Sequence, residues 1–302
     1  MHFKRIALMG RYSTQTTSHT LERLAAFLAT QPVETFIEAD TASYVPSLKL
    51  PTVTREALGK TVDLVIVIGG DGSLLNAAHA VVDDNIPVIG VNRGLLGFLT
   101  DISPDNLETA FAAILKGEYV KESRFLLDAS LFVDGKASKI GSALNDVVLY
   151  AGEIAQMIEF EMYINGQFVY SQRSDGLIIA TPTGSTAYSL SAGGPILHPS
   201  LESIVLVPMF PHTLTSRPIA VSSDSVIELR VARTRSSNHP AISCDGQALV
   251  ALAPGATLQI TRKKNTLTLI HPKDYDYYNT LRTKLEWGKP LQNKDFANPP
   301  QD

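Results

Sequence analysis

The pattern of apolar positions divides the chain into two parts. In the first part, short apolar runs typical of buried parallel strands alternate with segments in which apolar residues recur at helical spacing. Strands are predicted at 5–9, 33–38, 64–68 and 86–91, helices over 21–28, from Ser73 as the N-cap and over 104–116, and a surface loop at 39–52. The alternation of strand and helix predicts an α/β domain with a parallel sheet.

From about residue 125 the apolar period becomes two, and turn signals such as Asp134-Gly135 and Asn165-Gly166 separate the runs. Strands are predicted at 126–133, 143–149, 157–164, 168–170, 176–180, 204–207, 226–231, 241–244, 257–261 and 266–270, with Lys263-Lys264 in a solvated turn between the last two. This second part is therefore expected to be a β-rich domain. A last helix is predicted at 278–287, followed by a loose tail from Lys289.

The most informative stretch is 62–78, where the apolar run 64–68 meets Gly69-Gly70-Asp71-Gly72 and then a helical pattern. Glycines allow a ligand to lie against the main chain, and a helix N-terminus offers free N–H groups to a phosphate. Asp71 would repel that phosphate unless it orients a metal ion or accepts a proton from a reacting hydroxyl. A simple turn after a strand is the alternative interpretation.

Known nucleotide fingerprints do not fit this stretch. The dinucleotide motif requires a third glycine where Leu75 stands, and the chain contains no Gly-x-x-x-x-Gly-Lys-Ser/Thr sequence. The Gly-Gly-Asp-Gly loop resembles instead the loop shared by NAD kinases, diacylglycerol kinases and, more loosely, phosphofructokinases.

Composition narrows the classes of partner. The net charge of −4 gives no basic footprint for nucleic acid. The single cysteine, Cys244, excludes an internal disulfide and is expected to pack rather than react. Neither a signal peptide nor an apolar run of about 18 residues is present, so a cytoplasmic protein without a membrane span is expected.

A second glycine- and hydroxyl-rich segment lies at 171–195 and follows the predicted strand 176–180. Its small residues around Gly184 would present hydroxyl and N–H groups to a polar ligand. A capped helix after a strand would explain the same residues. A serine hydrolase is disfavoured because Gly184-Ser185-Thr186-Ala187-Tyr188 lacks the Gly-x-Ser-x-Gly elbow.

With this segment the resemblance becomes specific to the NAD kinase family. The segment from Asp175-Gly176 through 183–188 to Gly193-Gly194-Pro195 resembles the long signature of that family, which the other two kinase families do not combine with the aspartate loop. Matching motifs also stand at 90–100, 143–149, 244–247 and 269–275, and the resemblance runs from about residue 5 to 290.

The resemblance implies a fold and a reaction. The expected domains are an α/β ATP-site domain at 1–124 with 275–302, because the C-terminal segment returns to it, and a β-rich NAD-binding domain at 125–274, with the substrate between them. ATP and a divalent cation, expected to be Mg²⁺, would phosphorylate the 2′-hydroxyl of the adenosine ribose of NAD. A homo-oligomer, a dimer or tetramer, is implied as well. A lipid or sugar kinase with the same loop and a non-catalytic NADP-sensing module remain alternatives.

The resemblance also assigns site residues, although it names no metal ligands. Asp71 is the catalytic candidate, Gly69, Gly70 and Gly72 belong to the ATP loop, and Asn145 and Asp146 are expected to bind ribose hydroxyls. The complete set implied for NAD is Asp71, Gly72, Phe98, Asn145, Asp146, Arg173, Asp175, Thr186, Ala187, Tyr188 and Gln247. For Asn145 and Asp146 a turn at the entry to a strand is the alternative; for Arg173 it is an ordinary surface charge. His79 and His198 lack metal-ligand spacing and are interpreted as structural.

Overall fold

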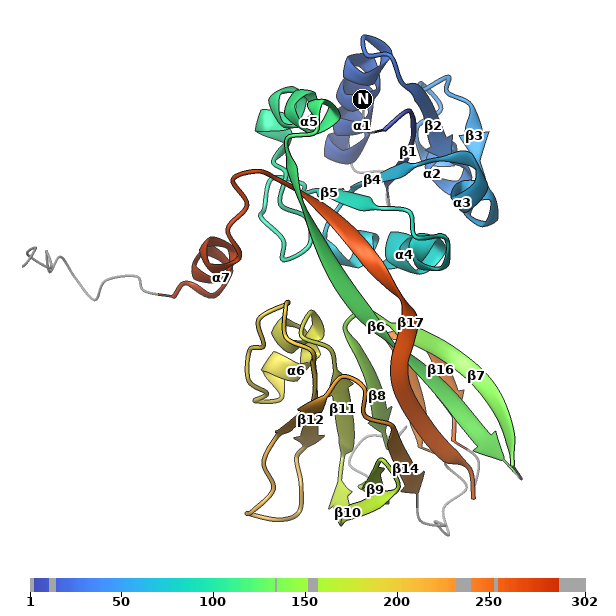
Figure 1. Cartoon of the computed structure of the whole chain (residues 1–302), viewed down its shortest axis with the longest axis vertical. Helices are drawn as coiled ribbons and strands as arrows, with labels where there is room; N and C mark the ends of the chain where they lie inside the picture. The colour runs from blue at the N-terminus through green and yellow to red at the C-terminus, as the bar shows by residue number, and fades with distance from the viewer. Residues whose placement is uncertain are drawn as a thin grey trace, which may run out of the picture. The chain divides into compact units, whose positions relative to one another are not determined.

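A computed structural model describes residues 3–10, 15–133, 135–151, 157–231, 240–252 and 255–287. The chain forms two compact units, each drawn in Figure 1. The α/β unit comprises Met1–Ala77, Pro87–Lys121 and Ile270–Asp302, and the β-rich unit comprises Ala78–Ile86 and Glu122–Leu269. The predicted fold class, an α/β part with a parallel sheet and a β-rich part, is confirmed. No helix in the described ranges is both long and apolar enough to cross a bilayer.

The α/β unit is built on parallel strands in the order β3-β2-β1-β4-β5, with the end of β17 beside β5. These strands are β1 (Arg5–Gly10), β2 (Glu34–Glu38), β3 (Thr52–Val53), β4 (Leu64–Ile68), β5 (Val88–Val91) and β17 (Thr257–Pro272). Every residue of β4 is buried, as its unbroken apolar run predicts for a central strand. The loops that leave β4 and β5 lie at the carboxyl edge of the sheet, where ligands of α/β proteins bind.

Helices cover both faces of this sheet. They are α1 (Gln15–Ala29), α2 (Ala39–Tyr44), α3 (Leu58–Thr61), α4 (Asp71–Val81) and α5 (Leu107–Lys116). The last helix of the unit, α7 (Tyr277–Leu285), follows β17. Leu24 of α1 and Phe111 of α5 pack with Ile66 of β4 in one core, and Figure 1 shows α4 on the opposite side of the sheet. Helix α5 ends at Gly117, which adopts φ +97° and so closes the helix in a left-handed conformation that glycine permits.

The β-rich unit consists of two antiparallel layers. The strands are β6 (Tyr119–Val133), β7 (Lys136–Ala143), β8 (Asp146–Tyr150), β9 (Ile158–Ile164), β10 (Gln167–Ser174), β11 (Gly176–Ala180), β12 (Ser203–Met209), β13 (Ile219–Ser222), β14 (Ile227–Val231), β15 (Ala241–Cys244) and β16 (Gln247–Ala251). One layer has the order β13-β12-β11-β8-β15-β16; β10, β9, β14, β17, β6 and β7 form the other. A short helix, α6 (Tyr188–Ser191), follows β11.

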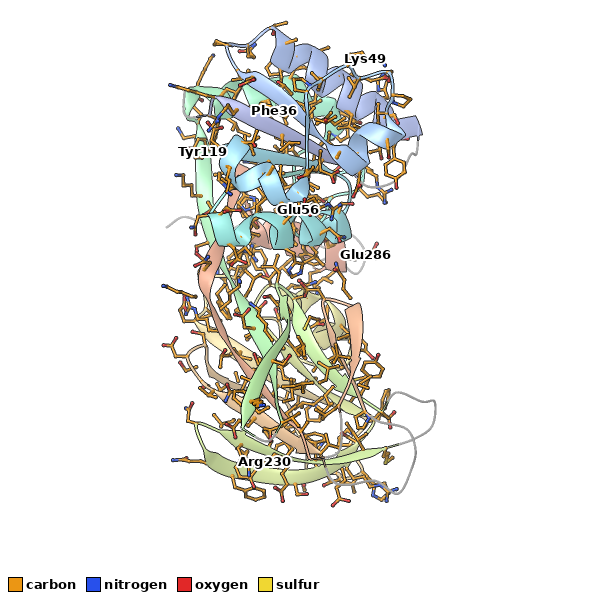
Figure 2. All side chains as sticks on the ribbon, turned by 90° about the vertical axis from the view of Figure 1, so that its right-hand side faces the viewer. Phe36, Lys49, Glu56, Tyr119, Arg230 and Glu286 are labelled. Carbon is orange, nitrogen blue, oxygen red and sulfur yellow. The ribbon has the colours of Figure 1, made fainter. Side chains whose placement is uncertain are left out.

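The core of the β-rich unit lies between these layers. Leu149 of β8 and Ile179 of β11 contribute to the same buried cluster as Phe160 of β9. Side chains fill this interior in Figure 2, while the labelled Arg230 places its guanidinium 4.2 Å from the ring centroid of Tyr163. The alternation of buried and exposed residues along β9 is the period of two that the sequence displays.

Several local predictions are wrong. The expected loop at 39–52 begins with helix α2, because the Glu38 side chain accepts a hydrogen bond from the N–H of Thr41 and caps it. The predicted strand 143–149 is interrupted by a turn between β7 and β8, whereas the two strands predicted on either side of Lys263 are one strand, β17. Lys263 is buried and its Nζ lies 2.6 Å from the Asp83 carboxylate, so it does not occupy a solvated turn.

The predictions for the two hairpin turns and for the C-terminal tail have different outcomes. The turn at Asn165-Gly166 is confirmed, since both residues have positive φ, at +52° and +77°. The Asp134-Gly135 turn falls partly outside the described residues, as Asp134 is not among them. The tail predicted from Lys289 lies outside them altogether.

Candidate active site

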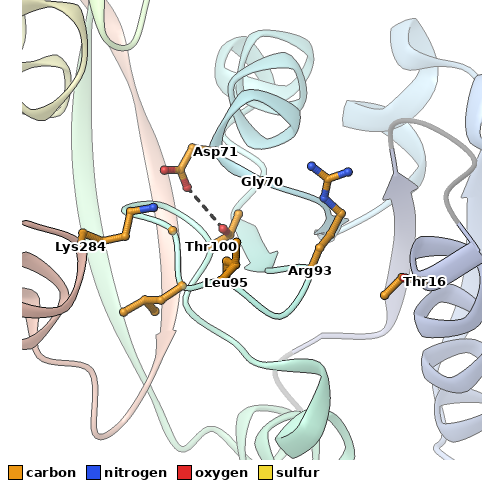
Figure 3. A pocket seen from close by; sticks show the side chains of 9 residues that line it. Thr16, Gly70, Asp71, Arg93, Leu95, Thr100 and Lys284 are labelled. Carbon is orange, nitrogen blue, oxygen red and sulfur yellow. Dashed lines mark hydrogen bonds between the residues drawn. The ribbon is translucent and has the colours of Figure 1, made fainter. Parts of the chain in front are cut away.

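The glycine loop between β4 and α4 opens on a cavity of about 420 Å³ in the α/β unit (Figure 3). The cavity is lined by Thr16, Gly70, Asp71, Arg93, Leu95, Leu96, Gly97, Thr100 and Lys284. Its lining comes from both glycine-rich loops that the sequence places after buried strands, together with helices α1 and α7. The space and its lining suit a polar ligand of small-molecule size.

The glycines of the loop serve different purposes. A Cβ atom on Gly69 would lie 2.6 Å from the Cβ of Ser73, so Gly69 allows close packing of the loop on the helix. Cβ atoms on Gly70 and Gly72 would meet nothing within 4 Å, so packing does not require glycine there. Helix α4 begins at Asp71, which makes the expectation that Ser73 is the N-cap wrong; Ser73 lies in the first turn.

Asp71 stands at the start of α4, where the helix dipole stabilises a negative charge. Its carboxylate accepts hydrogen bonds from the N–H of Phe98 at 2.9 Å and of Leu99 at 3.0 Å, and from the Thr100 hydroxyl at 3.3 Å. Asp71 therefore fixes the loop after β5 against the glycine loop. A carboxylate has about four lone-pair positions, so this arrangement leaves room for roughly one further partner.

Two cations that were not predicted as site residues, Arg93 and Lys284, line the same cavity. Arg93 belongs to the loop after β5, and Lys284 belongs to α7 (Figure 3). The Lys284 ammonium also lies 5.9 Å from the ring centroid of Phe98, which is partly buried. Arg93 has a local signal, since it stands in a glycine-containing loop after a strand. No local signal marks Lys284, which enters the cavity only through the return of the C-terminal segment.

In the β-rich unit, Asn145 of the predicted ribose-binding pair lies in the turn between β7 and β8, and Asp146 is the first residue of β8. The backbone N–H groups of Asn145 and Asp146 donate to Asp245 Oδ1 at 2.8 and 3.1 Å. On the carbonyl side, the N–H of Thr181 donates to the Asn145 oxygen at 2.9 Å. Gly184 packs so closely on Asn145 that a Cβ would overlap its carbonyl group. The structure thus brings together Asn145, Asp146 and the hydroxyl-rich loop.

Asp146 is a buried acid with an unusual titration. Burial disfavours its charged form and the nearby Asp245 carboxylate repels it, which together raise the pKa of Asp146 from 3.8 to about 7. Cys244, next to Asp245, is also buried, and the same two causes raise the pKa of its thiol to about 12. A thiol of that kind is a weak nucleophile, in keeping with the packing role expected from the sequence.

The remaining predicted NAD residues have varied positions in the β-rich unit. Thr186 and Ala187 are partly exposed, and Tyr188 at the start of α6 is 47% exposed. Asp175 is partly exposed between β10 and β11, and Arg173 is exposed on β10. Gln247 is the exposed first residue of β16 and pairs with Cys244 across the Asp245-Gly246 turn.

The predicted divalent cation would need carboxylate ligands near the cavity. Within the described residues, no group of three or more His, Cys, Asp and Glu side chains could hold a metal ion. Mg²⁺ in nucleotide sites is usually bound by one or two carboxylates together with substrate phosphates. Asp71, with its remaining acceptor capacity, fits that limited role.

The carboxyl edge of a parallel sheet presents a glycine loop and one acid here, and two cations line the same cavity, an arrangement typical of α/β proteins that bind phosphate groups. Two family models match the chain, ATP-NAD kinase N-terminal domain over residues 8–119 and ATP-NAD kinase C-terminal domain over residues 144–272. The chain belongs to the ATP-NAD kinase family.

Relatives with the name NAD kinase resemble the chain over almost its whole length. The protein from Chromohalobacter salexigens is 52% identical over 289 residues, which cover 96% of this chain and 98% of that protein. The protein from Pseudomonas fluorescens is 51% identical over 290 residues, with the same coverage.

Solved structures agree on the fold. The NAD kinase from Archaeoglobus fulgidus in complex with ATP has a TM-score of 0.71 at 26% identity and covers 92% of this chain and 99% of its own. Yeast NADH kinase complexed with NADH has a TM-score of 0.88 at 24% identity, covers 98% of this chain and 91% of its own, and supports the fold alone.

Proposed function

We propose that this chain is an NAD kinase, which transfers the γ-phosphate of ATP to the 2′-hydroxyl of the adenosine ribose of NAD and releases NADP and ADP. The observation that carries the proposal is the placement of Asp71 at the start of α4, in a cavity that also contains Arg93 and Lys284. Membership of the ATP-NAD kinase family supplies the identity of both substrates.

On the ATP side, the open main chain at Gly70 and Gly72 is proposed to receive phosphate oxygens, with Gly69 keeping the loop close to its helix. Arg93 and Lys284 would neutralise the triphosphate, since guanidinium and ammonium groups bind phosphate through charge-assisted hydrogen bonds. Asp71 would use its remaining acceptor position to take the proton of the attacking hydroxyl or to orient the metal ion. When bound with ATP, Mg²⁺ would neutralise charge on the phosphates.

On the NAD side, Asn145 and Asp146 are proposed to hold a vicinal diol. The amide and the carboxyl group offer donors and acceptors side by side, and a carboxyl with a pKa near 7 is present in both forms at neutral pH. Positioning of the hydroxyl supplies much of the catalysis in phosphoryl transfer. The other proposed NAD contacts are Asp71, Gly72, Phe98, Arg173, Asp175, Thr186, Ala187, Tyr188 and Gln247.

We also propose a cellular location and an oligomeric state for the enzyme. A cytoplasmic location agrees with the presence of a single cysteine, Cys244, which allows no internal disulfide. A homo-oligomer, as a dimer or tetramer, is proposed from the family. The net charge of −4 favours no nucleic-acid partner.

One experiment tests the proposed function. Purified protein is incubated with NAD, ATP and Mg²⁺, and NADP and ADP are measured by chromatography. Equal amounts of NADP and ADP are expected. Binding of NADP without any turnover would indicate a sensing module instead, and ADP formed only with a lipid or a sugar acceptor would indicate a different kinase.

A further inference from the structure

Asp245 occupies the tight turn between β15 and β16. It has φ +51° and the following Gly246 has φ +68°, the pair of positive values that a two-residue hairpin of type I′ requires. Aspartate before glycine is common at such turns, which would account for the residue by local geometry alone. Its side chain, however, has an exposed fraction of 0% and makes contacts that the turn does not need.

The Asp245 carboxylate binds a segment about 100 residues away in sequence. Oδ1 accepts from the N–H groups of Asn145 at 2.8 Å and Asp146 at 3.1 Å, and Oδ2 accepts from the N–H of Leu144 at 2.8 Å. In return, the N–H of Asp245 donates to the carbonyl of Asp146 at 2.9 Å. Three consecutive amides therefore converge on one buried carboxylate, which holds the backbone of 144–146, the segment that carries both predicted ribose ligands.

His79 completes this arrangement. Its Nε2 lies 2.8 Å from Asp245 Oδ2, and its side chain is 25% exposed. Both His79 and Asp245 belong to the β-rich unit. The histidine is near the end of helix α4 and gives the carboxylate a fourth hydrogen-bonding partner, so that Oδ2 is held both by the N–H of Leu144 and by the His79 ring.

Resting on the function proposed above, we propose that Asp245 is a positioning residue for NAD: it sets the orientation of Asn145 and Asp146 through their backbone amides, and His79 holds Asp245 in place. Neither residue needs to touch the substrate. Small displacements of positioning groups weaken binding and turnover strongly, by as much as about 100-fold for roughly 1 Å. The proposal therefore predicts effects on NAD that do not extend to ATP.

The first test is Asp245→Asn, which preserves the size of the side chain but replaces one acceptor oxygen by an NH₂ group that cannot accept. The dissociation constants of NAD and of ATP are measured separately by titration calorimetry, and hydrogen exchange is measured on the peptide that contains 144–146. We expect NAD to bind about 10- to 100-fold more weakly, ATP to bind within twofold of wild type, and these amides to exchange faster. Unchanged NAD affinity in the folded variant would overturn the proposal.

The second test does not depend on the stability of Asp245→Asn. His79→Leu removes the hydrogen bond, whereas His79→Gln retains a polar group at its end. His198→Gln is the matched control, because His198 bonds to Ser200 and is not a partner of Asp245. We expect NAD affinity to fall by about 3- to 10-fold in His79→Leu, to recover in His79→Gln and to be unchanged in the control. Equal affinities in all of these proteins would overturn the role of His79.

The wild-type reaction separates the two levels of the proposal. Failure of wild-type protein to form NADP would contradict the proposed function itself. Normal formation of NADP by wild type, together with normal NAD affinity in Asp245→Asn and both His79 variants, would contradict only the positioning role.

Discussion

Gly184 and Asn145 are in such close contact that a Cβ atom on Gly184 would lie 2.7 Å from the Asn145 Cα and overlap its carbonyl group. The glycine is therefore required by the approach of two backbones and not by helix capping. Gly184→Val should displace the Asn145 turn and weaken NAD binding by at least about 10-fold, while most of the β-rich core stays folded.

The NAD dissociation constant and the thermal unfolding midpoint check this prediction. Ser191→Val adds bulk to the same segment at an exposed position of α6 and is the control. If Gly184→Val bound NAD normally, the hydroxyl-rich segment would be a capped helix without a binding role.

Asp71→Asn should reduce kcat by about 10²- to 10⁴-fold, because both proposed roles of Asp71 need its negative charge. The variant should still fold and bind NAD. Thr100→Val is the matched control, since it removes only one hydrogen bond from the Asp71 carboxylate and keeps the charge; its kcat should fall by less than about 10-fold.

A titration with Mg²⁺ separates the two roles. Recovery of the Asp71→Asn rate at high Mg²⁺ would favour orientation of the metal, and no recovery with ATP affinity intact would favour proton acceptance. Near-normal turnover at every Mg²⁺ concentration would reduce Asp71 to an anchor of the loop at Phe98 and Leu99.

Lys284→Ala should raise the KM for ATP by about 10-fold and leave the KM for NAD unchanged, because a charge-assisted contact to phosphate contributes on the order of 1.5 kcal/mol or more. Arg282→Ala is the control: it removes a cation from the same helix, where Arg282 pairs with Asp276 at 3.3 Å and does not line the cavity. Steady-state kinetics with each substrate varied in turn provide the measurement. Equal effects of the two substitutions would indicate a general effect of charge.

Asp146→Asn should change how stability depends on pH. An acid with a raised pKa holds its proton more tightly in the folded chain, so its contribution to stability is complete below the unfolded value near 4 and is lost as pH rises through about 7. The unfolding midpoint of Asp146→Asn relative to wild type should therefore increase between about pH 4 and pH 7 and level off above that. Asp224→Asn, at a side chain that is 84% exposed, is the control. Parallel pH curves for wild type and Asp146→Asn would contradict the raised pKa.

Elements with a strong local signal were predictable from sequence. The apolar run 64–68 forms the buried strand β4, and the strands predicted at 176–180 and 241–244 match β11 and β15. The helix predicted at 104–116 corresponds to a short 3₁₀ turn followed by α5, and it ends at Gly117 as expected. The spacing of apolar residues, the length of apolar runs and the positions of glycines are local features of a few residues, so these elements can be predicted from the sequence directly.

Elements that depend on distant partners were not predictable in the same way. The cap of helix α2 is local, since Glu38 accepts from the N–H of Thr41 three residues on, but Arg55, which holds the same carboxylate, is 17 residues away. The buried Lys263 is a strand residue because Asp83 provides its counter-charge. The local pattern predicts a solvated turn for a lysine pair, because a buried charge requires a partner and the partner is not adjacent in the sequence.

The sequence by itself determined the two-part fold and the aspartate loop, because these features are carried by contiguous residues. Its family motifs also predict the NAD residues. Only the tertiary structure decided two further features: Lys284 lines the cavity beside Asp71, and Asp245, bonded to His79, accepts from the amides of Asn145 and Asp146. Hydrogen bonds and ion pairs between segments about 100 residues or more apart leave no periodicity in the chain. Their geometry exists only once the backbone has brought donor and acceptor within about 3 Å.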